Sequence, residues 1–250
     1  MPTKRRFLAA LLLLTGIAAH PATAAQTNVA VAANFTDAAK EIAAAFKGKT
    51  GDEAVLSFGA TGQLYTQMTQ AAPFEILLSA DDERPRKAVA DGLAVAGSPF
   101  TYAIGKLVLW SKSPGLVKGE ETLKDATFAK LSICNPQAAP YGEAAVETMR
   151  SLKLEDALKP KLVVGANISQ AFQFVDSRNA ELGFVALSQL TGKSEGSRWL
   201  VPQEFYKPIR QDAVLLNKGA NNPAAVGFLQ FLKGPEAHAI IEKYGYAFSS

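Results

Sequence analysis

Cysteine and histidine are scarce in this chain of 250 residues, which contains one Cys and two His. His20 lies within the first 25 residues, so Cys134 and His238 are the two such residues in the rest of the chain. A single thiol cannot form an intrachain disulfide, and zinc sites need several Cys or His ligands. A Ser-His-Asp triad could use only His238, in the helix-like stretch GPEAHAIIEKYG. These absences argue against a disulfide scaffold, a zinc site and a histidine-dependent hydrolase.

The chain also lacks an excess of either charge once its first 25 residues are set aside. Its formal net charge of +3 comes from 26 basic and 23 acidic residues. Three basic and no acidic residues lie at positions 1–25, which leaves 23 basic against 23 acidic residues beyond them. A nucleic-acid-binding surface needs a basic excess or a basic stripe. We therefore expect no nucleic-acid partner.

No segment is apolar over the roughly 20 residues that a membrane span needs. The segment that comes nearest lies at the N-terminus, where basic residues at 4–6 precede an apolar run at 7–19 and small residues at 22–24. This order is typical of a secretory signal peptide. We expect residues 1–25 to be cleaved on export by the Sec or the twin-arginine route, with a retained membrane anchor as the weaker alternative.

One pattern repeats along the rest of the chain: a short apolar run, a charge-free turn of small or polar residues, and a helix-like segment. It occurs three times between residues 29 and 92 and three times between 130 and 190. Apolar strands that alternate with helices predict parallel strands with helices on both faces of the sheet. The sequence therefore predicts an α/β fold built from two groups of three units.

An extended apolar segment without a helix follows each group, SPFTYAIGKLVLWSKSPG after the first and FYKPIRQDAVLLNKG after the second. This order predicts two α/β lobes joined by two crossover strands, each lobe a mainly parallel sheet flanked by helices. We place lobe 1 at residues 26–105 and 207–250, and lobe 2 at residues 106–206. Ligands of open α/β sheets bind at the carboxyl ends of the strands, so we expect a ligand in the cleft between the lobes. A single doubly wound sheet is the alternative.

The turns that follow these strands contain no Lys or Arg. Helices that start in them offer unpaired main-chain N–H groups and the positive end of the helix dipole, which bind oxyanions without a formal counter-charge. A site with donors only suits a fully deprotonated dianion. Neutral donors and small residues accompany the N–H groups: Asn34, Thr36, Gly59, Thr61, Gly62, Gln63, Asn135, Gln137, Tyr141, Gly142, Gly165, Asn167, Ser169 and Ser188.

Each of these residues also has a simpler interpretation. Asn34 and Thr36 are of types that commonly cap helices. Gly59 and Gly62 suit a tight turn, and Tyr141 suits an apolar core. The prediction of an anion site rests on several such turns meeting in one cleft.

Seven segments at and between these turns resemble the periplasmic molybdate-binding proteins of ABC transporters, which are type II periplasmic binding proteins. They are, in chain order, VAVAANFT, SFGATGQLY, FEILLSAD, GKLVLWS, NPQAAPYG, LGFVAL and FLKGPEAHAIIEKYGY. The resemblance covers essentially the whole chain beyond residue 25. It implies a monomeric two-lobe protein of the periplasm that closes around molybdate, and usually tungstate. It also implies delivery to a membrane permease, with no cofactor and no catalysis.

The resemblance also implies the ligand contacts, carried over by position. The first turn supplies Asn34 with the main chain of Ala33 beside it, and the second supplies a hydroxyl at Thr61, where the family more often has serine. In lobe 2 the contacts fall on Tyr141 and on the main-chain N–H of Ile168. All of them reach the oxygen atoms of molybdate, so none is a direct ligand of the metal.

One position departs from the family pattern. Some members have a ligand tyrosine after the LGFV-like strand, where this chain has Ala186. We expect the Tyr141 hydroxyl, in the stretch APYG, to supply the missing donor.

Other functions compete with this interpretation. Sulfate is also a fully deprotonated dianion and differs from molybdate in size, so a sulfate-binding protein is the alternative. An enzyme that uses the same cleft would need a base, a nucleophile or a metal, and the sequence shows no Walker loop and no pair of histidines beyond residue 25. Binders of amino acids, sugars or ferric iron would favour Arg with an acid, stacked aromatics, or several Tyr and His. Among the turns, only Tyr141 fits any of these.

Overall fold

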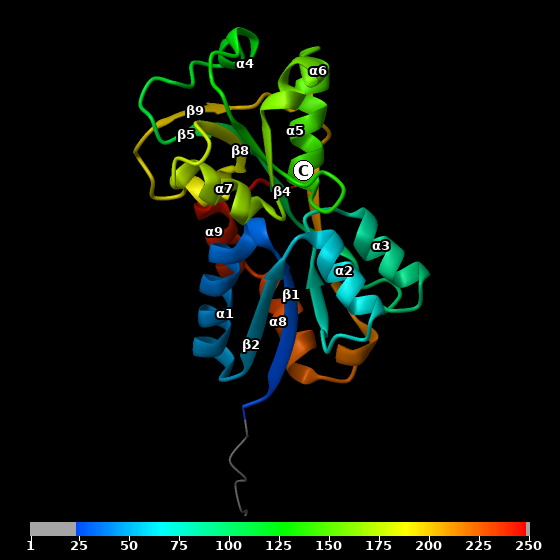
Figure 1. The fold of residues 1–250 in the computed structure, drawn as a ribbon. Coiled ribbons are helices and arrows are strands. Elements are labelled where there is room, and N and C mark those ends of the chain that lie inside the picture. The colour runs from blue at the N-terminus through cyan, green and yellow to red at the C-terminus, as the bar shows by residue number, and fades with distance from the viewer. Residues whose placement is uncertain (1–23, 249–250) are drawn as a thin grey trace, which may run out of the picture.

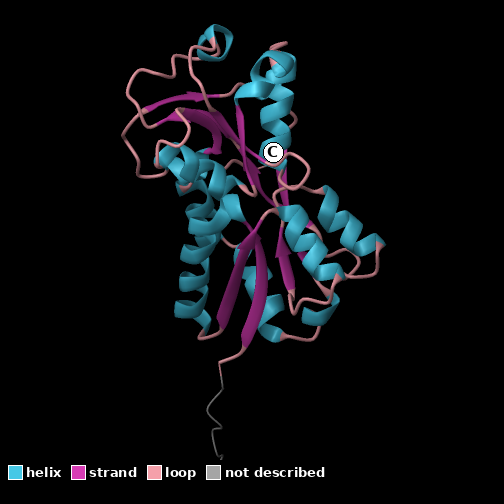
Figure 2. Cartoon of the chain, in the orientation of Figure 1, coloured by secondary structure: helices cyan, strands magenta, loops and turns pink. Residues whose placement is uncertain are grey.

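The computed structural model describes residues 24–248. These residues form two lobes, one above the other in Figure 1. The predicted signal peptide at 1–25 lies outside this range except for Ala24 and Ala25. No helix within 24–248 is long and apolar enough to span a membrane. Each lobe consists of one sheet flanked by helices (Figure 2), which confirms the predicted fold class.

Lobe 1, the lower lobe in Figure 1, is built on a five-stranded sheet with the order β2-β1-β3-β10-β4. Strand β1 pairs in parallel with β2 and β3, whereas β10 runs antiparallel to β3 and β4. The strands are β1 (Gln26–Ala32), β2 (Glu53–Gly59), β3 (Ile76–Leu78), β4 (Phe100–Gly105) and β10 (Ile209–Leu215).

Helices cover both faces of this sheet. Val29 and Val31 of β1 pack into one hydrophobic cluster and Ala30 into another, because successive side chains of a strand point to opposite faces. Residues of the 3-10 turn η1 (Ala33–Phe35) and of α1 (Thr36–Thr50), α8 (Pro223–Leu232) and α9 (Pro235–Lys243) belong to the first cluster. Residues of α2 (Thr61–Thr69) and α3 (Glu83–Ala90) belong to the second.

Lobe 2 contains a second five-stranded sheet with the order β7-β6-β8-β5-β9. Its strands are β5 (Leu107–Ser111), β6 (Leu131–Cys134), β7 (Leu162–Gly165), β8 (Leu182–Ala186) and β9 (Ser197–Leu200). Its helices are α4 (Glu121–Asp125), α5 (Pro140–Ser151), α6 (Glu155–Leu158) and α7 (Ile168–Asp176). Three further 3-10 turns lie in or next to this lobe, η2 (Lys159–Lys161), η3 (Leu187–Leu190) and η4 (Gln203–Phe205), and η5 (Asn217–Gly219) follows β10.

Both sheets are mixed rather than mainly parallel. In lobe 2, β6 pairs in parallel with β7 and β8, whereas β5 runs antiparallel to β8 and β9. Half of the strand pairs in each sheet are therefore antiparallel. The cause is that each helix-free apolar segment inserts one strand of opposite direction: the first divides into β4 and the reversed strand β5, and the second contributes the reversed strand β10.

The lobes are joined where the chain crosses between the two sheets. Lys106 separates β4 of lobe 1 from β5 of lobe 2, and residues 201–208 lead from β9 back to β10. A third segment supports this region, because Ala247 and Ile104 exchange two main-chain hydrogen bonds of 2.6 and 3.0 Å. The C-terminal segment thus lies against β4 close to the first crossing.

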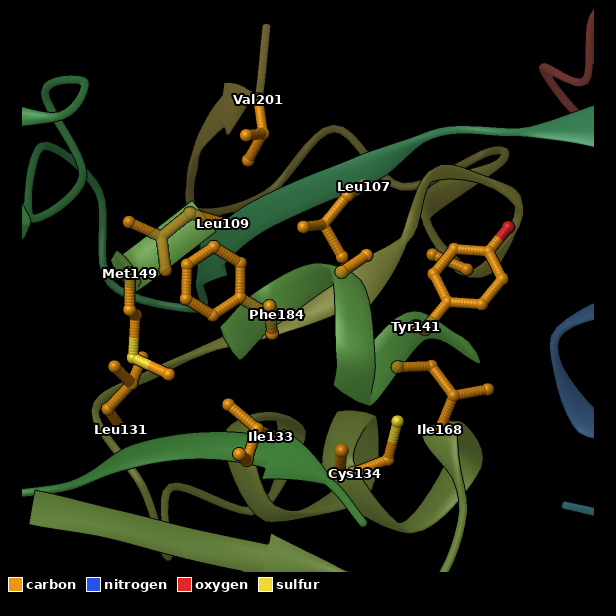
Figure 3. Close-up of a cluster of buried hydrophobic side chains, with 14 of the residues drawn as sticks. Leu107, Leu109, Leu131, Ile133, Cys134, Tyr141, Met149, Ile168, Phe184 and Val201 are labelled. Atoms are coloured by element: carbon orange, nitrogen blue, oxygen red, sulfur yellow. The ribbon is translucent and has the colours of Figure 1, made fainter. Parts of the chain in front are cut away.

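Figure 3 shows the main hydrophobic cluster of lobe 2, in which Phe184 of β8 lies beside Leu109 and Met149. All three side chains are fully buried. Truncating Phe184 to alanine removes most of this packing and leaves a cavity. We expect Phe184→Ala to lower the free energy of unfolding by about 3–5 kcal/mol. Chemical denaturation of the purified protein measures the change, and an unchanged midpoint would contradict the packing described here.

Candidate functional site

A small cavity lies between the two lobes. No Asp, Glu, Lys, Arg or His from the described part of the chain lines it. All five residues predicted from the sequence to contact the ligand line this cavity. Ala186 is fully buried at the end of β8 and does not line it. The lining consists of Ala32, Ala33, Asn34, Gly59, Ala60, Thr61 and Ala80 of lobe 1 and Ala139, Pro140, Tyr141 and Ile168 of lobe 2.

Four helical segments begin at this cavity. η1 begins at Ala33 and continues into α1, α2 begins at Thr61, α5 at Pro140 and α7 at Ile168. The first N–H groups of a helix have no acceptor within it, and the helix dipole places partial positive charge at that end. Two helix starts from each lobe therefore give the cavity a positive potential without a charged side chain.

Local sequence determines where the two helices of lobe 2 start. Pro140 occupies the first turn of α5, where its missing N–H is not needed. Asn167 precedes α7, and its side chain accepts the main-chain N–H of Gln170 at 3.0 Å. Gly142 allows α5 to approach the end of β6, because a Cβ there would lie 2.9 Å from the main-chain carbon of Asn135. These features hold Tyr141 and Ile168 at the cavity.

Two hydroxyl groups in the cavity lining each accept a hydrogen bond from an N–H group of the protein. The Thr61 Oγ1 accepts the main-chain N–H of Ala80 at 3.1 Å. The Tyr141 hydroxyl accepts from the Nε2 of Gln211 at 3.3 Å. Because a hydroxyl carries one proton, each keeps that proton to donate to a group in the cavity. Together with the helix starts, they present donors to the cavity.

Tyr141 is held by its surroundings as a neutral donor. Its ring packs near Leu107 and Ile168 in the cluster of Figure 3, with the hydroxyl oxygen at the edge of the cluster. Burial is the main cause that raises the pKa of Tyr141 well above its ordinary value, and neighbouring tyrosines add to it. The hydroxyl therefore keeps its proton throughout the physiological pH range.

Asn34 does not cap a helix, contrary to the simpler interpretation of this residue. Its Nδ2 donates to the Oε1 of Gln211 at 2.8 Å and to the Tyr246 hydroxyl at 3.0 Å. Its main-chain oxygen accepts from the hydroxyls of Tyr246 and Ser188, both at 2.8 Å. Since both amide hydrogens are used within the protein, the donors that the first turn offers to a ligand are the main-chain N–H groups of Ala33 and Asn34.

Gln211 and Tyr246 are the residues of this arrangement that the sequence analysis missed. Neither residue lies in a turn after a strand, because Gln211 lies inside β10 and Tyr246 lies after α9. A signal was present in the case of Gln211: three consecutive polar residues, Arg210, Gln211 and Asp212, lie in a strand whose other residues are apolar. Gln211 and Asp212 are buried. A buried polar side chain needs hydrogen-bond partners, so its presence indicates a network.

The two lobes are in contact around the cavity. The main-chain N–H of Gly62 in lobe 1 donates to the oxygen of Ala138 in lobe 2 at 2.9 Å. The guanidinium of Arg84, which pairs with Asp81, donates to the oxygen of Gln137 at 3.3 Å. These contacts hold the two lobes against each other beside the cavity. Arg84 lies on α3 outside the cavity lining, so the cavity itself contains no cation from the described residues.

Replacing the Thr61 hydroxyl tests whether it accepts the hydrogen bond from Ala80. Thr61→Val leaves the N–H of Ala80, a residue that is 2% exposed, without its acceptor. We expect a loss of about 1–3 kcal/mol in the free energy of unfolding, as for other unpaired buried donors. Thr61→Ser keeps the acceptor and serves as the matched control, with an expected change below about 1 kcal/mol on the same scale. Equal stability of the valine variant and the parent in denaturant titrations would contradict this assignment.

Comparisons with known proteins agree with the fold. The family model of bacterial extracellular solute-binding proteins matches residues 27–247. The chain is 54% identical over 244 residues to the molybdate-binding protein ModA of Rhodobacter capsulatus, which covers 98% of this chain and 96% of that protein. It is 54% identical over 235 residues to ModA of Azotobacter vinelandii, covering 92% and 93%.

A solved structure gives the same result. The periplasmic molybdate-binding protein of Azotobacter vinelandii superposes on this chain with a TM-score of 0.87 at 39% sequence identity, covering 90% of this chain and all of that one. The chain therefore belongs to the family of bacterial extracellular solute-binding proteins, and these molybdate-binding proteins are its homologues.

Proposed function

We propose that this chain binds molybdate, and tungstate with it, and delivers the anion to the permease of an ABC transporter. The observation that carries the proposal is the cavity between the lobes. Helix starts and two hydroxyl groups present hydrogen-bond donors to it, and no charged side chain of the described residues lines it. Molybdate at neutral pH is a deprotonated dianion that offers only acceptors, so its chemistry matches this lining. The homology to two proteins named for molybdate binding supports the choice of ligand.

Five donors are available to hold the four oxygen atoms of the anion. They are the main-chain N–H groups of Ala33, Asn34 and Ile168 and the hydroxyls of Thr61 and Tyr141. Each hydrogen bond to an ion contributes roughly 1.5–3 kcal/mol net, so five contribute on the order of 10 kcal/mol before the cost of association. This amount is enough for micromolar or tighter binding without a cation.

The same lining disfavours phosphate. Phosphate keeps a proton at neutral pH and is best held where an acceptor, often a carboxylate, receives it. The nearest carboxylates of the turns, Asp37 and Glu143, line other grooves between the lobes and not this cavity. Sulfate carries the same charge and acceptors as molybdate, so only its size can exclude it. The homology favours molybdate over sulfate.

Binding without turnover is the activity that the cavity supports. The titratable side chain in its lining is Tyr141, whose raised pKa makes it a poor base. The stretch GKSEG at 192–196 matches a Gly-x-Ser-x-Gly pattern, but it lies in the loop between η3 and β9 with Ser194 exposed. A nucleophile elbow needs a turn from a strand into a helix, so this serine does not form one.

We also infer where and with what partner the protein works. Solute-binding homologues support a location in the periplasm after export, and a closed form that presents both lobes to a membrane permease. We propose that the protein acts as a monomer with no cofactor, because opening and closing of two lobes needs no second subunit.

Titration calorimetry of residues 26–250 with molybdate, tungstate, sulfate and phosphate tests the ligand. We expect tight binding of the first two anions and weak or no binding of the others. Tight binding of sulfate alone would keep the donor mechanism and change the ligand, whereas binding of none of the four would refute the proposed function.

The Tyr141 hydroxyl is expected to supply one of the five donors. Tyr141→Phe keeps the buried ring and removes the hydroxyl, so we expect molybdate affinity to fall by roughly tenfold to a hundredfold, the value of one hydrogen bond to an ion. Calorimetry measures the affinity, and thermal unfolding without ligand checks that the variant is folded. A variant that binds as tightly as the parent would show that another group replaces the tyrosine missing at Ala186.

Gly62 is expected to permit closure. A Cβ at this position would lie 3.2 Å from the main-chain oxygen of Ala138 in the other lobe, so a larger side chain keeps the lobes apart. We expect Gly62→Val to weaken molybdate binding by about tenfold or more, with stability in the absence of ligand changed by less than about 1 kcal/mol. Gly48→Val is the matched control, because a Cβ on Gly48 of α1 would have no neighbour within 4 Å. Full affinity of the Gly62 variant would show that the contact is dispensable.

A further inference from the structure

Gln211 lies behind the ligand cavity, in the strand by which the chain returns to lobe 1. It belongs to β10 and is fully buried. The pairing of β10 with β4 shifts register between Gln211 and Asp212, which marks a bulge at this point. Gln211 is not part of the cavity lining, so it does not touch a ligand held there.

The two ends of the Gln211 amide contact different lobes. Its Oε1 accepts from the Nδ2 of Asn34 at 2.8 Å and lies 3.1 Å from the hydroxyl of Tyr102. Its Nε2 donates to the hydroxyl of Tyr141, across the boundary between the lobes, at 3.3 Å. The orientation of the amide follows from Asn34, whose Nδ2 can only donate and must therefore face an oxygen.

The space around this contact is closed. Gly105, the last residue of β4, lies so near that a Cβ on it would be 2.6 Å from the Nε2 of Gln211 and would overlap the hydroxyl of Tyr141. No side chain larger than hydrogen fits between the two groups and the main chain. The Tyr141 hydroxyl consequently has few alternatives to accepting from Gln211 once the lobes are closed.

This contact determines what the Tyr141 hydroxyl offers to an anion. A hydroxyl that faced an acceptor would donate its proton inward to the protein and present a lone pair, which repels an oxyanion. Because Gln211 supplies an N–H, the Tyr141 proton is left for the cavity. A hydroxyl that donates to an anion also becomes a better acceptor, so the two hydrogen bonds strengthen each other.

We propose that Gln211 is a positioning residue for the anion: its Nε2–H fixes the polarity of the Tyr141 hydroxyl and couples anion binding to closure of the lobes. The inference rests on the proposed function, since it concerns the same cavity. Its specific content is that Gln211 acts through Tyr141, and that an acceptor in its place impairs binding.

A double-mutant cycle with molybdate tests this proposal. Gln211→Met preserves the approximate size of the side chain and removes the amide. We expect it to weaken binding by roughly tenfold in the parent and by less than about threefold in a Tyr141→Phe background, where the hydroxyl it positions is absent. Equal losses in the two backgrounds, or no loss in either, would overturn the proposal, because Gln211 would then act elsewhere or not at all.

Gln211→Glu distinguishes the role of the Oε1 contacts from that of the Nε2 contact. It retains an oxygen for Asn34 and Tyr102 but replaces the N–H that faces Tyr141 with an acceptor. We expect it to bind molybdate no better than Gln211→Met. Binding equal to that of the parent would overturn the proposal, because the contacts to Asn34 and Tyr102 would then account for the role of Gln211.

Ser111→Ala controls for the loss of a hydrogen bond made by a fully buried side chain. The Ser111 hydroxyl donates to the oxygen of Glu181 in lobe 2, and neither residue lines the cavity. We expect its affinity to stay within about twofold of the parent, and a comparable loss here would attribute the Gln211 effect to general destabilisation. If the parent itself binds none of the oxyanions, the proposed function and this inference fail together, whereas failure of the cycle alone leaves the function intact.

Discussion

A dianion that meets no formal positive charge must be held by donors whose acceptor side is already occupied. This constraint explains the second layer of residues around the cavity. The N–H of Ala80 donates to the Thr61 hydroxyl, and the Nε2 of Gln211 donates to the Tyr141 hydroxyl, so both hydroxyl protons remain available for an anion. Neutral groups that are fixed in this way lose little freedom when an anion arrives, because their orientation is set in advance. The precision of the hydrogen-bond network therefore takes the place of a cation.

The division of the donors between two lobes adds a second requirement. Neither lobe presents the full set, since the starts of η1 and α2 belong to one lobe and those of α5 and α7 to the other. Some direct contacts between the lobes involve main-chain atoms, as between Gly62 and Ala138, and between Ser188 and the oxygen of Asn34, whereas the contact between Gln211 and Tyr141 joins two side chains. Individual hydrogen bonds of this kind contribute modestly. In the function proposed above, an anion that bridges both sets of donors contributes more, and it would favour the form in which the lobes meet.

The sequence predicted the parts of this arrangement that depend on local pattern. Repeated strand–turn–helix units predicted two α/β lobes, and charge-free turns such as those at Asn34 and Thr61 predicted an anion site in the cleft. The choice of individual contact residues came from the resemblance to the molybdate-binding proteins. It did not predict the direction of β5 and β10, because apolar periodicity is the same in parallel and antiparallel strands. Gln211 was missed for a related reason: its role comes from the packing of β10 beside β4, which joins residues more than one hundred positions apart.

Tyr246 links the two ends of the chain, since its hydroxyl bonds to Asn34, 212 positions earlier in the sequence. The order of synthesis gives this link a consequence. The first turn of the cavity is made early, but its amide and its main-chain oxygen gain their tyrosine partner only after residue 246 has been added. A nascent chain that has produced both lobes up to that point still lacks this clamp. The hydrogen-bond network around Asn34 is therefore complete only once residue 246 has been made.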